Sequence, residues 1–455
     1  MSLIIPANTL ASGGFSVGNS VRFNRGDSPY LSKTFSTDGT HHDKGTISMW
    51  VKKSCTGVET GLYHAGTSSR DFLRFESNDT LTFRNTSGHH LNTNRVFRDV
   101  SAFYNIVLAF DSSQGTASNR VKIYVNGVQE TSFATETYPS QNRDMKMMAA
   151  ELQRISSDSE GGAAPFMDGY LSEIVGIDGQ QLDATSFGEF DEDSGIWKPI
   201  DVSGLTFGTN GFYLDFEDSG ALGDDVSGNG NDFTVNNLTA TDQSTDTCTN
   251  NFCTLSPLAD STSILSDGNC VNNADGSQTT SKGSIAVSNG RWYVECKITT
   301  SSQYPMLGIW SVETAAFQNP TNTSYPGQVT PSYGGYGNGS IYANGSNTGS
   351  QGFTWGNGNI IGIYLDLESA TKTIKWYKDG SSIATLNLAT TTDAFVFGDY
   401  NSANSLTASW NFGNPVFAIS SGNTDANGYG NFEFSPTIGG VDYFAICTKN
   451  LAEYG

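Results

Sequence analysis

Short runs of apolar residues recur along most of the chain and alternate with polar, turn-forming stretches. In the first part of the chain they include residues 45–51, 104–110 and 121–125, which are rich in β-branched and aromatic side chains. Such side chains are favoured on the pleated, half-buried surface of a strand. The runs follow one another at spacings of roughly 10–20 residues, and most of the intervening sequence has no helical period. This pattern predicts a β-sandwich.

A second series of similar runs follows later in the chain, at residues 291–298, 360–366, 373–377 and 406–412. In each series, one run is followed directly or after one residue by a dipeptide that favours a tight hairpin, Asn126-Gly127 or Asp379-Gly380. Asn, Asp and Gly adopt the positive φ angles of such turns at little cost. The predicted fold class is therefore all-β, with two β-sandwich domains in series joined by a polar connector.

The same pattern suggests boundaries for five parts of the chain. A polar, turn-rich connector separates the two sandwiches, and one further strand follows the second sandwich. The parts are residues 1–19, 20–185 (first sandwich), 186–265 (connector), 266–417 (second sandwich) and 418–455.

Two segments have more than one interpretation. Residues 1–19 are apolar, with Gly and Ser, and form either a docking arm, with Leu3, Ile4 and Ile5 buried in a partner, or a first strand of the sandwich. Residues 144–155 contain good helix formers. They form either a partner-binding helix or, as we favour, a single helical turn or a strand along a sheet edge.

Composition and charge limit the kind of partner. Charged residues make up only 15 % of the chain, and the formal net charge is −22. Such a negative field repels nucleic acid and anionic lipid, so we do not expect a genome-binding role. No stretch approaches the roughly 20 apolar residues of a membrane span. The N-terminal residues lack the basic region of a signal peptide.

The six cysteines are too few for a disulfide scaffold in a chain of 455 residues. We expect them to be reduced, as in a protein assembled in the cytoplasm. A pairing or a shared metal at Cys248 and Cys253 is the alternative.

Several of these motifs resemble known domain families. The first sandwich is similar to laminin-G-like, concanavalin-type jelly rolls, through G-T-I-S-M-W-V at residues 45–51, K-I-Y-V-N-G-V at 122–128 and D-G-Y-L-S-E-I at 168–174. The second resembles the SPRY module, through G-R-W-Y-V-E-C at 290–296 and I-G-I-Y-L-D at 361–366, with K-W-Y-K-D-G at 375–380. The resemblance implies sandwich folds and no catalytic residues.

The combination of the two modules resembles tailed-phage proteins. So do T-D-T-C-T-N-N-F-C-T-L-S-P at residues 245–257 and the ending, N-F-G-N-P-V-F at 411–417 and D-Y-F-A-I-C-T-K-N-L at 442–451. This resemblance implies a non-enzymatic virion protein: a tail fibre, a tail tip or another surface appendage that contacts host surface glycans. Its partners would be other virion proteins and further copies of itself, with a trimer favoured. The alternatives are a capsid decoration or head fibre protein with a purely architectural role, and a polysaccharide-degrading tail enzyme.

The sequence offers little catalytic chemistry. Glycoside hydrolases with a jelly-roll fold carry E-x-D-x-x-E on one strand, which places carboxylates on one face. The nearest match, at residues 189–194, lacks the third glutamate and has turn-like flanks. We therefore interpret it as a solvated acidic loop. The histidines stand outside any nucleophile or protease signature, and we expect them on the surface: His41, His42, His64, His89 and His90.

One segment matches the first half of a calcium loop. Oxygen-bearing side chains alternate at Asp225, Ser227, Asn229 and Asn231, with glycine at the sixth position. The twelfth position holds Asn236 instead of the bidentate glutamate of an EF-hand. The same residues also make good turns, so calcium as a cofactor and a metal-free turn are both open.

The clearest binding signal is an uncharged, aromatic stretch in the second sandwich. Residues 314–365 contain no Asp, Glu, Lys, Arg or His. Tyrosine and tryptophan supply rigid contact area there, and Asn, Ser and Gly supply adaptable hydrogen bonds. The stretch therefore contacts a glycan, contacts a subunit or packs on its own sandwich. The candidate residues are Tyr325, Tyr333, Tyr336, Tyr342 and Trp355.

Overall fold

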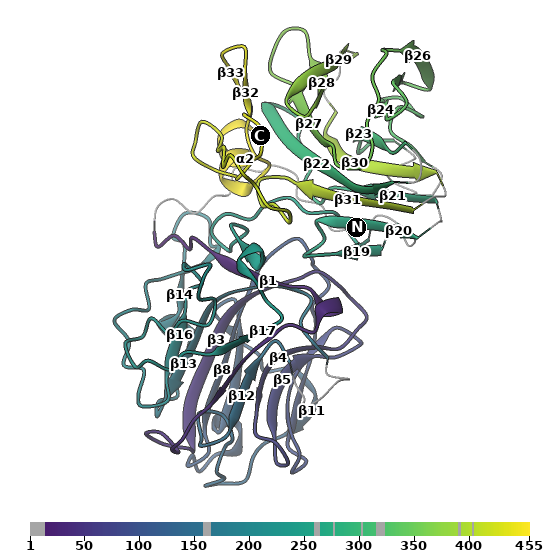
Figure 1. The fold of residues 1–455 in the computed structure, drawn as a ribbon. Coiled ribbons are helices and arrows are strands. Elements are labelled where there is room, and N and C mark those ends of the chain that lie inside the picture. The colour runs from purple at the N-terminus through teal and green to yellow at the C-terminus, as the bar shows by residue number, and fades with distance from the viewer. Residues whose placement is uncertain are drawn as a thin grey trace. The chain divides into compact units, whose positions relative to one another are not determined.

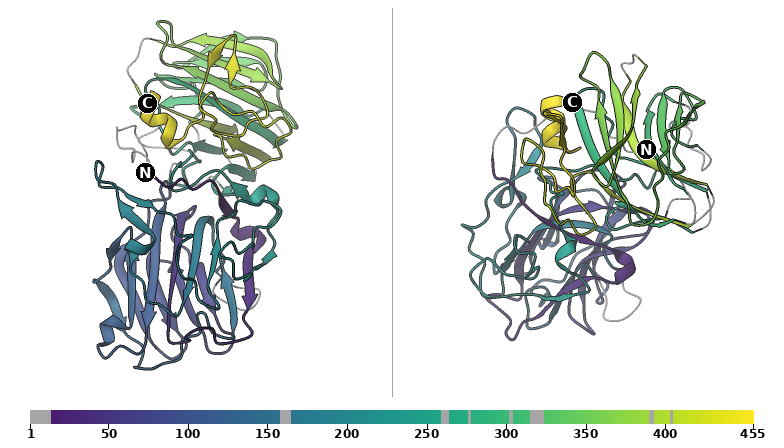
Figure 2. Two further views of the ribbon diagram at one scale, coloured as in Figure 1. Left: turned by 90° about the vertical axis from the view of Figure 1, so that its left-hand side faces the viewer. Right: turned by 45° about the horizontal axis from the view of Figure 1, so that its top comes forward.

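A computed structural model describes residues 14–157, 165–258, 264–275, 278–301, 304–314, 324–389, 393–402 and 405–455. The described residues divide into two compact units, one ending at Thr249 and the other spanning Asn250–Gly455. We call them the N-terminal unit and the C-terminal unit (Figures 1 and 2). Both are β-sandwiches, so the predicted all-β fold class is confirmed.

The N-terminal unit consists of two antiparallel sheets, named here after one strand of each. The β3 sheet has the order β10 (Val128–Gln129), β9 (Val121–Val125), β8 (Tyr104–Asp111), β3 (Lys44–Lys53), β13 (Gly169–Asp178), β1 (Ser20–Phe23) and β18 (Gln243–Ser244), and β16 (Phe212–Leu214) also pairs with β13. The β5 sheet has the order β11 (Phe133–Thr137), β7 (His90–Val96), β6 (Thr80–Asn85), β5 (Asp71–Phe75), β4 (Thr60–Ala65), β12 (Leu152–Ile155), β2 (Tyr30–Thr34) and β17 (Thr234–Asn236).

Alternation along the strands builds the core between these sheets. In β3, the side chains of Ile47, Met49 and Val51 join the central apolar cluster, whereas Trp50 joins a second cluster on the other face of the sheet. This division follows from the period of two in a strand. Asn126 and Gly127 have φ angles of 48° and 79° between β9 and β10, which confirms the hairpin predicted from that dipeptide.

The predicted connector is divided between the units, and its first part is a second layer of the N-terminal unit. Trp197, Phe207 and Tyr213 pack with Trp50 on the outer face of the β3 sheet. Trp197 belongs to a hairpin of β14 (Gly188–Phe190) and β15 (Trp197–Pro199). The indole of Trp197 donates a hydrogen bond to the Asn105 side chain at 3.1 Å. The first part of the connector therefore shares an apolar core with the outer face of the β3 sheet.

Residues 144–155 do not form the helix that was one interpretation. Met148 has a φ of 64°, which a continuous helix does not allow, and β12 follows at Leu152–Ile155. The favoured interpretation was a single helical turn or a strand along a sheet edge. The end of the segment does form a strand, but β12 lies between β4 and β2 and not at an edge of the sheet. Met145 and Met147 are buried in the core.

Of the predicted docking arm, residues 1–13, which include Leu3, Ile4 and Ile5, lie outside the described residues. Val17 is buried, and its backbone N–H donates to the Thr249 hydroxyl at 3.0 Å. The Thr247 hydroxyl donates to the Val17 carbonyl at 3.0 Å. This described part therefore packs along residues 247–249 of the same unit.

The C-terminal unit is also a pair of antiparallel sheets. The β22 sheet has the order β19 (Ile264–Ser266), β20 (Val271–Asp275), β31 (Ser405–Asn411), β22 (Arg291–Ser301), β27 (Ile360–Asp366), β28 (Thr373–Lys378) and β29 (Ser381–Asn387). The β23 sheet has the order β21 (Gln278–Lys282), β30 (Phe395–Ser402), β23 (Met306–Ser311), β24 (Ser332–Tyr336), β25 (Ser340–Ala343) and β26 (Ser346–Ser350). Asp379 and Gly380, with φ of 48° and 78°, close the predicted hairpin between β28 and β29.

The C-terminal segment covers the outer face of the β22 sheet, where the yellow chain lies beside β22 in Figure 1. It contains β32 (Thr437–Ile438), β33 (Val441–Asp442) and α2 (Thr448–Tyr454). Glu295 of β22 anchors it, because this fully buried carboxylate accepts hydrogen bonds from the backbone N–H groups of Glu433 and Phe434 at 3.0 and 2.8 Å. The segment is therefore part of the unit's packing.

All six cysteines are free thiols. In the part of the chain that the structure describes, no helix is long and apolar enough to cross a membrane.

A buried carboxyl group makes the stability of the N-terminal unit depend on pH. Glu173 lies at a bulge of β13 with a φ of 48°, and the Tyr213 hydroxyl donates to its carboxyl at 2.5 Å. Burial, and then the nearby charges of Asp215, Glu217 and Asp201, raise the pKa of Glu173 to about 7.

Because the folded-state pKa exceeds the unfolded one, the protonated form of Glu173 favours folding at low pH, and this contribution is lost as pH rises through about 7. We expect the wild type to lose about 3 kcal/mol of unfolding free energy between pH 5 and 8.5 relative to Glu173→Gln. Urea unfolding of both proteins at the two pH values measures this difference. Parallel pH profiles would contradict it.

Candidate functional site

Five tyrosines form a partly exposed group on the outer face of the β23 sheet. Tyr400 of β30 and Tyr336 of β24 lie on either side of Met306 in register. The Tyr304 ring meets Tyr336 edge-on, with ring centroids 6.3 Å apart. On the other side, the Tyr325 ring lies 5.7 Å from Tyr400 and 5.5 Å from Tyr342. We call Tyr304, Tyr325, Tyr336, Tyr342 and Tyr400 the tyrosine patch.

Three glycines in register shape the sheet beneath this patch. Gly334, Gly308 and Gly398 lie side by side on β24, β23 and β30, and we call them the glycine row. A Cβ atom on Gly308 or Gly334 would lie within 3.0 Å of the Pro326 Cβ. The absence of side chains there lets the segment around Pro326 lie directly on the sheet, which places Tyr325 between Tyr342 and Tyr400.

The phenol hydroxyls of the tyrosine patch have no hydrogen-bond partner among the described residues. Tyr304 is 45 % exposed, whereas Tyr400 is 8 % exposed. Burial, together with the neighbouring phenols of Tyr336 and Tyr325, raises the pKa of Tyr400. The patch thus presents neutral rings and hydroxyl groups that can donate and accept. Neutral sugars are recognised by such a combination of flat apolar faces and hydroxyls.

The sequence prediction is wrong for two of its five aromatic residues. Tyr333 and Trp355 are 1 % and 2 % exposed and belong to the core between the sheets. Their polar atoms are used inside the unit: the Trp355 indole donates to the Pro305 carbonyl at 3.2 Å, and the Tyr333 hydroxyl accepts from the Ala389 N–H at 2.9 Å. These two residues pack on their own sandwich, which was one of the alternatives for the stretch.

Sequence reasoning missed Tyr304 and Tyr400, which lie outside the uncharged stretch. Alternation could have indicated Tyr400, because Phe395 and Phe397 of β30 point into the core and Tyr400 has the opposite parity. Tyr304 precedes β23 and had no such signal.

The predicted calcium ligands hold a turn through hydrogen bonds. The Asp225 carboxylate, 7 % exposed, accepts from the backbone N–H groups of Tyr213, Ser227 and Asn231 at 2.9, 3.0 and 2.7 Å. The amides of Asn229 and Asn231 donate to the carbonyls of Gly208, Thr209 and Gly211. The Ser227 hydroxyl accepts from the Asn229 N–H at 3.3 Å. These contacts favour the alternative of a metal-free turn.

We expect Asp225→Ala to lower the unfolding free energy of the N-terminal unit by about 2–3 kcal/mol, because three backbone donors lose a buried acceptor. Calcium should contribute nothing: thermal unfolding in EDTA and in excess calcium should give the same midpoint. A midpoint that rises with calcium in the wild type but not in Asp225→Ala would instead support the calcium loop.

The acidic residues near β14 do not resemble a catalytic pair. Lys198 forms ion pairs with Glu189 and Asp191 at 3.4 and 3.2 Å. Hydrogen bonds from Ser194 lower the pKa of Asp191 to about 2, whereas a general acid needs a raised pKa. Within the described residues, no group of three or more His, Cys, Asp or Glu side chains is placed to hold a metal.

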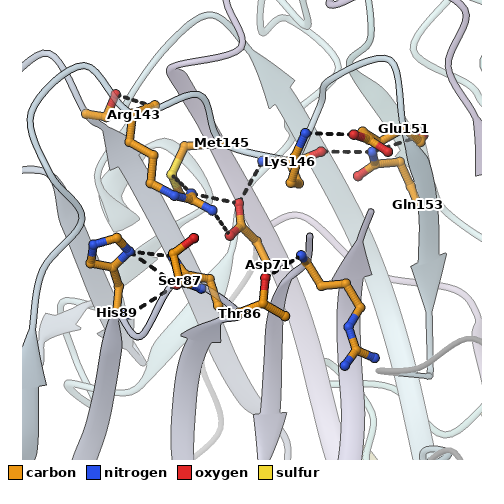
Figure 3. A network of polar contacts seen from close by, with 12 residues as sticks. Asp71, Thr86, Ser87, His89, Arg143, Met145, Lys146, Glu151 and Gln153 are labelled. Carbon is orange, nitrogen blue, oxygen red and sulfur yellow. Dashed lines mark hydrogen bonds and ion pairs between the residues drawn. The ribbon is translucent and has the colours of Figure 1, made fainter. Parts of the chain in front are cut away.

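The prediction that all five histidines lie on the surface is wrong for one of them. His64 is fully buried, and the other four are at least partly exposed. His89 belongs to a polar network at one end of the β5 sheet (Figure 3). At its centre, the buried Asp71 carboxylate pairs with the Arg143 guanidinium at 2.7 Å and accepts the Lys146 N–H at 2.7 Å. These groups satisfy one another, which indicates a structural role.

Residues 25–175 match the family described as the concanavalin A-like lectin/glucanases superfamily. This match confirms the predicted concanavalin-type fold of the first sandwich. No curated protein matches the chain.

Several solved structures are similar to parts of the chain. The SPRY domain of human HERC1 is 15 % identical, with 34 % of this chain and 96 % of that chain covered and a TM-score of 0.29. A putative carbohydrate binding protein from Bacteroides ovatus is 14 % identical, with 50 % and 60 % covered and a TM-score of 0.35. A SAP-like pentraxin from Limulus polyphemus is 15 % identical, with 37 % and 80 % covered and a TM-score of 0.28.

Proposed function

We propose that this chain is a non-enzymatic structural protein of a tailed-phage virion, and that its tyrosine patch contacts neutral sugars of the host surface. The tyrosine patch carries the glycan part of this proposal, because its rings other than Tyr400 are at least partly exposed and its hydroxyls are unbonded within the described residues. The concanavalin-type match of residues 25–175 is compatible with a lectin-like role.

The virion part of the proposal is supported by the resemblance of residues 245–257, 411–417 and 442–451 to phage proteins that join these two modules. A tail fibre or tail tip would present many copies of a weak sugar site, so that avidity multiplies its strength. A homo-oligomer, with a trimer favoured, fits such an appendage. Antibodies against the chain should label the surface of intact particles in electron micrographs, and unlabelled particles would contradict this assignment.

The acidic residues Glu189 and Asp191 give little support to the alternative of a polysaccharide-degrading enzyme. Asp191 stays ionised and paired with Lys198, and Glu189 is an exposed residue bound to the same lysine. If the chain is instead a capsid decoration protein with an architectural role, loss of the tyrosine patch should weaken assembly and leave adsorption to the host unchanged.

We expect Tyr336→Ala and Tyr304→Ala each to weaken binding of the full chain to a neutral oligosaccharide at least tenfold, a loss of about 1.4 kcal/mol. Tyr138→Ala is the matched control, because Tyr138 lies in the N-terminal unit and its hydroxyl already bonds to Glu136. An array of neutral oligosaccharides, followed by titration of the best one, measures the effect. Equal binding by all four proteins would refute the tyrosine patch as the site.

A further inference from the structure

The β22 sheet ends in a long strand whose outer edge is open. β29 (Ser381–Asn387) pairs only with β28 and is the last strand of the sheet (Figure 1). It has seven residues, and none of them is charged or a proline. At about 3.3 Å per residue, its free edge is about 23 Å long. A free strand edge offers unpaired N–H and C=O groups to another strand.

The other edges of the four large sheets, within the described residues, are short, charged, interrupted or covered. β10 and β18 have two residues each, and β16, β17 and β19 have three. β11 carries Glu136, and β26 contains Gly349 with a φ of 102°. β21 is covered, because the Ser256 N–H donates to the Lys282 carbonyl at 2.8 Å. Short, charged or covered edges hinder pairing between molecules, so β29 is the edge best suited to it.

The backbone groups of Thr385 and Asn387 point away from the sheet. The Leu388 N–H donates at 2.8 Å to the carbonyl of Lys372, which directly precedes β28. In an antiparallel ladder, every second residue bonds to the same neighbouring strand. Leu386 therefore faces β28, whereas Thr385 and Asn387 face outward. Within the described residues, these outward groups have no hydrogen-bond partner.

The strand is also neutral in a strongly acidic chain. Residues 380–392 contain no Asp, Glu, Lys, Arg or His, although the formal net charge of the protein is −22. Two copies of so negative a chain repel each other, and the repulsion is weakest where neutral segments meet. A second copy supplies a strand of equal length and equal neutrality, which favours self-association at this edge.

We infer that two copies of this chain associate through β29, in antiparallel pairing about a two-fold axis at Thr385. In this register, Thr385 of each copy faces Thr385 of the other, and the pair exchanges two backbone hydrogen bonds. Leu386 lies opposite Ala384 of the second copy. Both side chains pack at the margin of the core and are partly buried, so the pairing covers apolar surface that is otherwise exposed.

The contact is small, so the association is weak. A bulge between Ser382 and Ala384 limits the regular part of the strand. One pair of strands buries less than the roughly 800 Å² per partner of a stable interface, and we expect a Kd above about 10 μM. Many copies on one surface would raise the local concentration and strengthen the pairing. The inference concerns self-association alone and does not rest on the glycan or the virion proposal.

Sedimentation velocity of the full chain, from about 1 to about 500 μM, measures the association. The wild type should change from monomer to dimer over this range. Thr385→Pro removes the central outward N–H and leaves the bonds to β28 in place, so it should weaken the association at least tenfold. Ser346→Lys, on the exposed edge strand β26, is the control for a changed edge residue and should associate like the wild type.

A pair of charged variants tests the register. Thr385→Lys and Thr385→Glu should each weaken self-association at least tenfold, because the two-fold axis places like charges opposite each other. A one-to-one mixture of the two should associate at least as strongly as the wild type. All variants should keep the wild-type thermal midpoint, because Thr385 is exposed.

Three results would each overturn the inference. They are a wild type that stays monomeric over the whole range, Thr385 variants that associate like the wild type, and a mixture of the Lys and Glu variants no stronger than either alone. A trimer whose mass is unchanged in the Thr385 variants is an example of the second result. Sugar binding by the tyrosine patch is measured separately, so its failure and the failure of this inference are distinguishable.

Discussion

Replacing Lys52 with methionine is expected to lower the unfolding free energy of the N-terminal unit by about 3–5 kcal/mol. The Lys52 ammonium lies 2.7 Å from the Asp246 carboxylate, and the two side chains are 1 % and 0 % exposed. Methionine preserves most of the apolar stem but leaves a buried carboxylate without its cation. The variant should also release residues 243–246, whose chain this ion pair ties to β3. Urea unfolding and hydrogen exchange of that segment measure the two effects.

Lys146→Met is the matched control for this prediction. Lys146 forms an ion pair with Glu151 at the same distance of 2.7 Å, but the two side chains are 26 % and 28 % exposed. Solvent screens such a pair, so its loss should cost less than about 1 kcal/mol. A double variant, Lys52→Met with Asp246→Leu, should recover much of the loss, because no buried charge remains. Similar losses for the two single variants would mean that burial does not govern this ion pair.

Removal of the Glu295 carboxylate, by Glu295→Ala, is expected to free the C-terminal segment from the β22 sheet. In addition to the two backbone N–H groups, the carboxylate accepts from the Tyr293 hydroxyl at 2.8 Å and the Asn411 amide at 3.1 Å. Each buried donor left without an acceptor costs about 1–3 kcal/mol, so the total should be at least about 3 kcal/mol.

Hydrogen exchange measures which part of the C-terminal unit loses protection when the Glu295 carboxylate is removed. Amides of residues 423–434 should exchange far faster in Glu295→Ala than in the wild type, while those of the core strand β23 should change less. Glu313→Ala, which removes an exposed glutamate from the same unit, should leave both regions unchanged. Unchanged protection of residues 423–434 in Glu295→Ala would show that the apolar contacts of the segment hold it without this anchor.

Local patterns predicted the strands well because the relevant physics is local. The turns at Asn126-Gly127 and Asp379-Gly380 depend on the φ preference of two residues, and the core positions of β3 depend on alternation. The second layer over the β3 sheet was not predicted. Trp197, Phe207 and Tyr213 are separated by polar residues without a period, and their partner Trp50 lies far away in the sequence.

The prediction of binding residues from the sequence has the same limit, because local patterns do not show which segments lie side by side. The uncharged stretch drew attention to the region of Tyr325 and Tyr342, but composition alone does not separate an outward ring from an inward one such as Trp355. The strand order β7-β6-β5-β4-β12 was out of reach, because pairings between segments distant in the sequence leave no local pattern. In that order β12, from a segment with helix-forming residues, enters the sheet beside β4 and brings Arg154 next to His64.

The glycine row has a consequence for how the tyrosine patch can diversify. Most of the patch stands on or beside the strands of the sheet, whereas the segment from Ser324 to Pro331 adds Tyr325 and rests on bare backbone. This segment is also fixed by hydrogen bonds, because the Ser324 carbonyl accepts from the Thr280 hydroxyl at 2.9 Å and the Gly327 N–H donates to the Ser332 hydroxyl at 2.9 Å. We therefore expect the patch to vary at its ring positions and to keep the backbone of this segment together with Gly308 and Gly334.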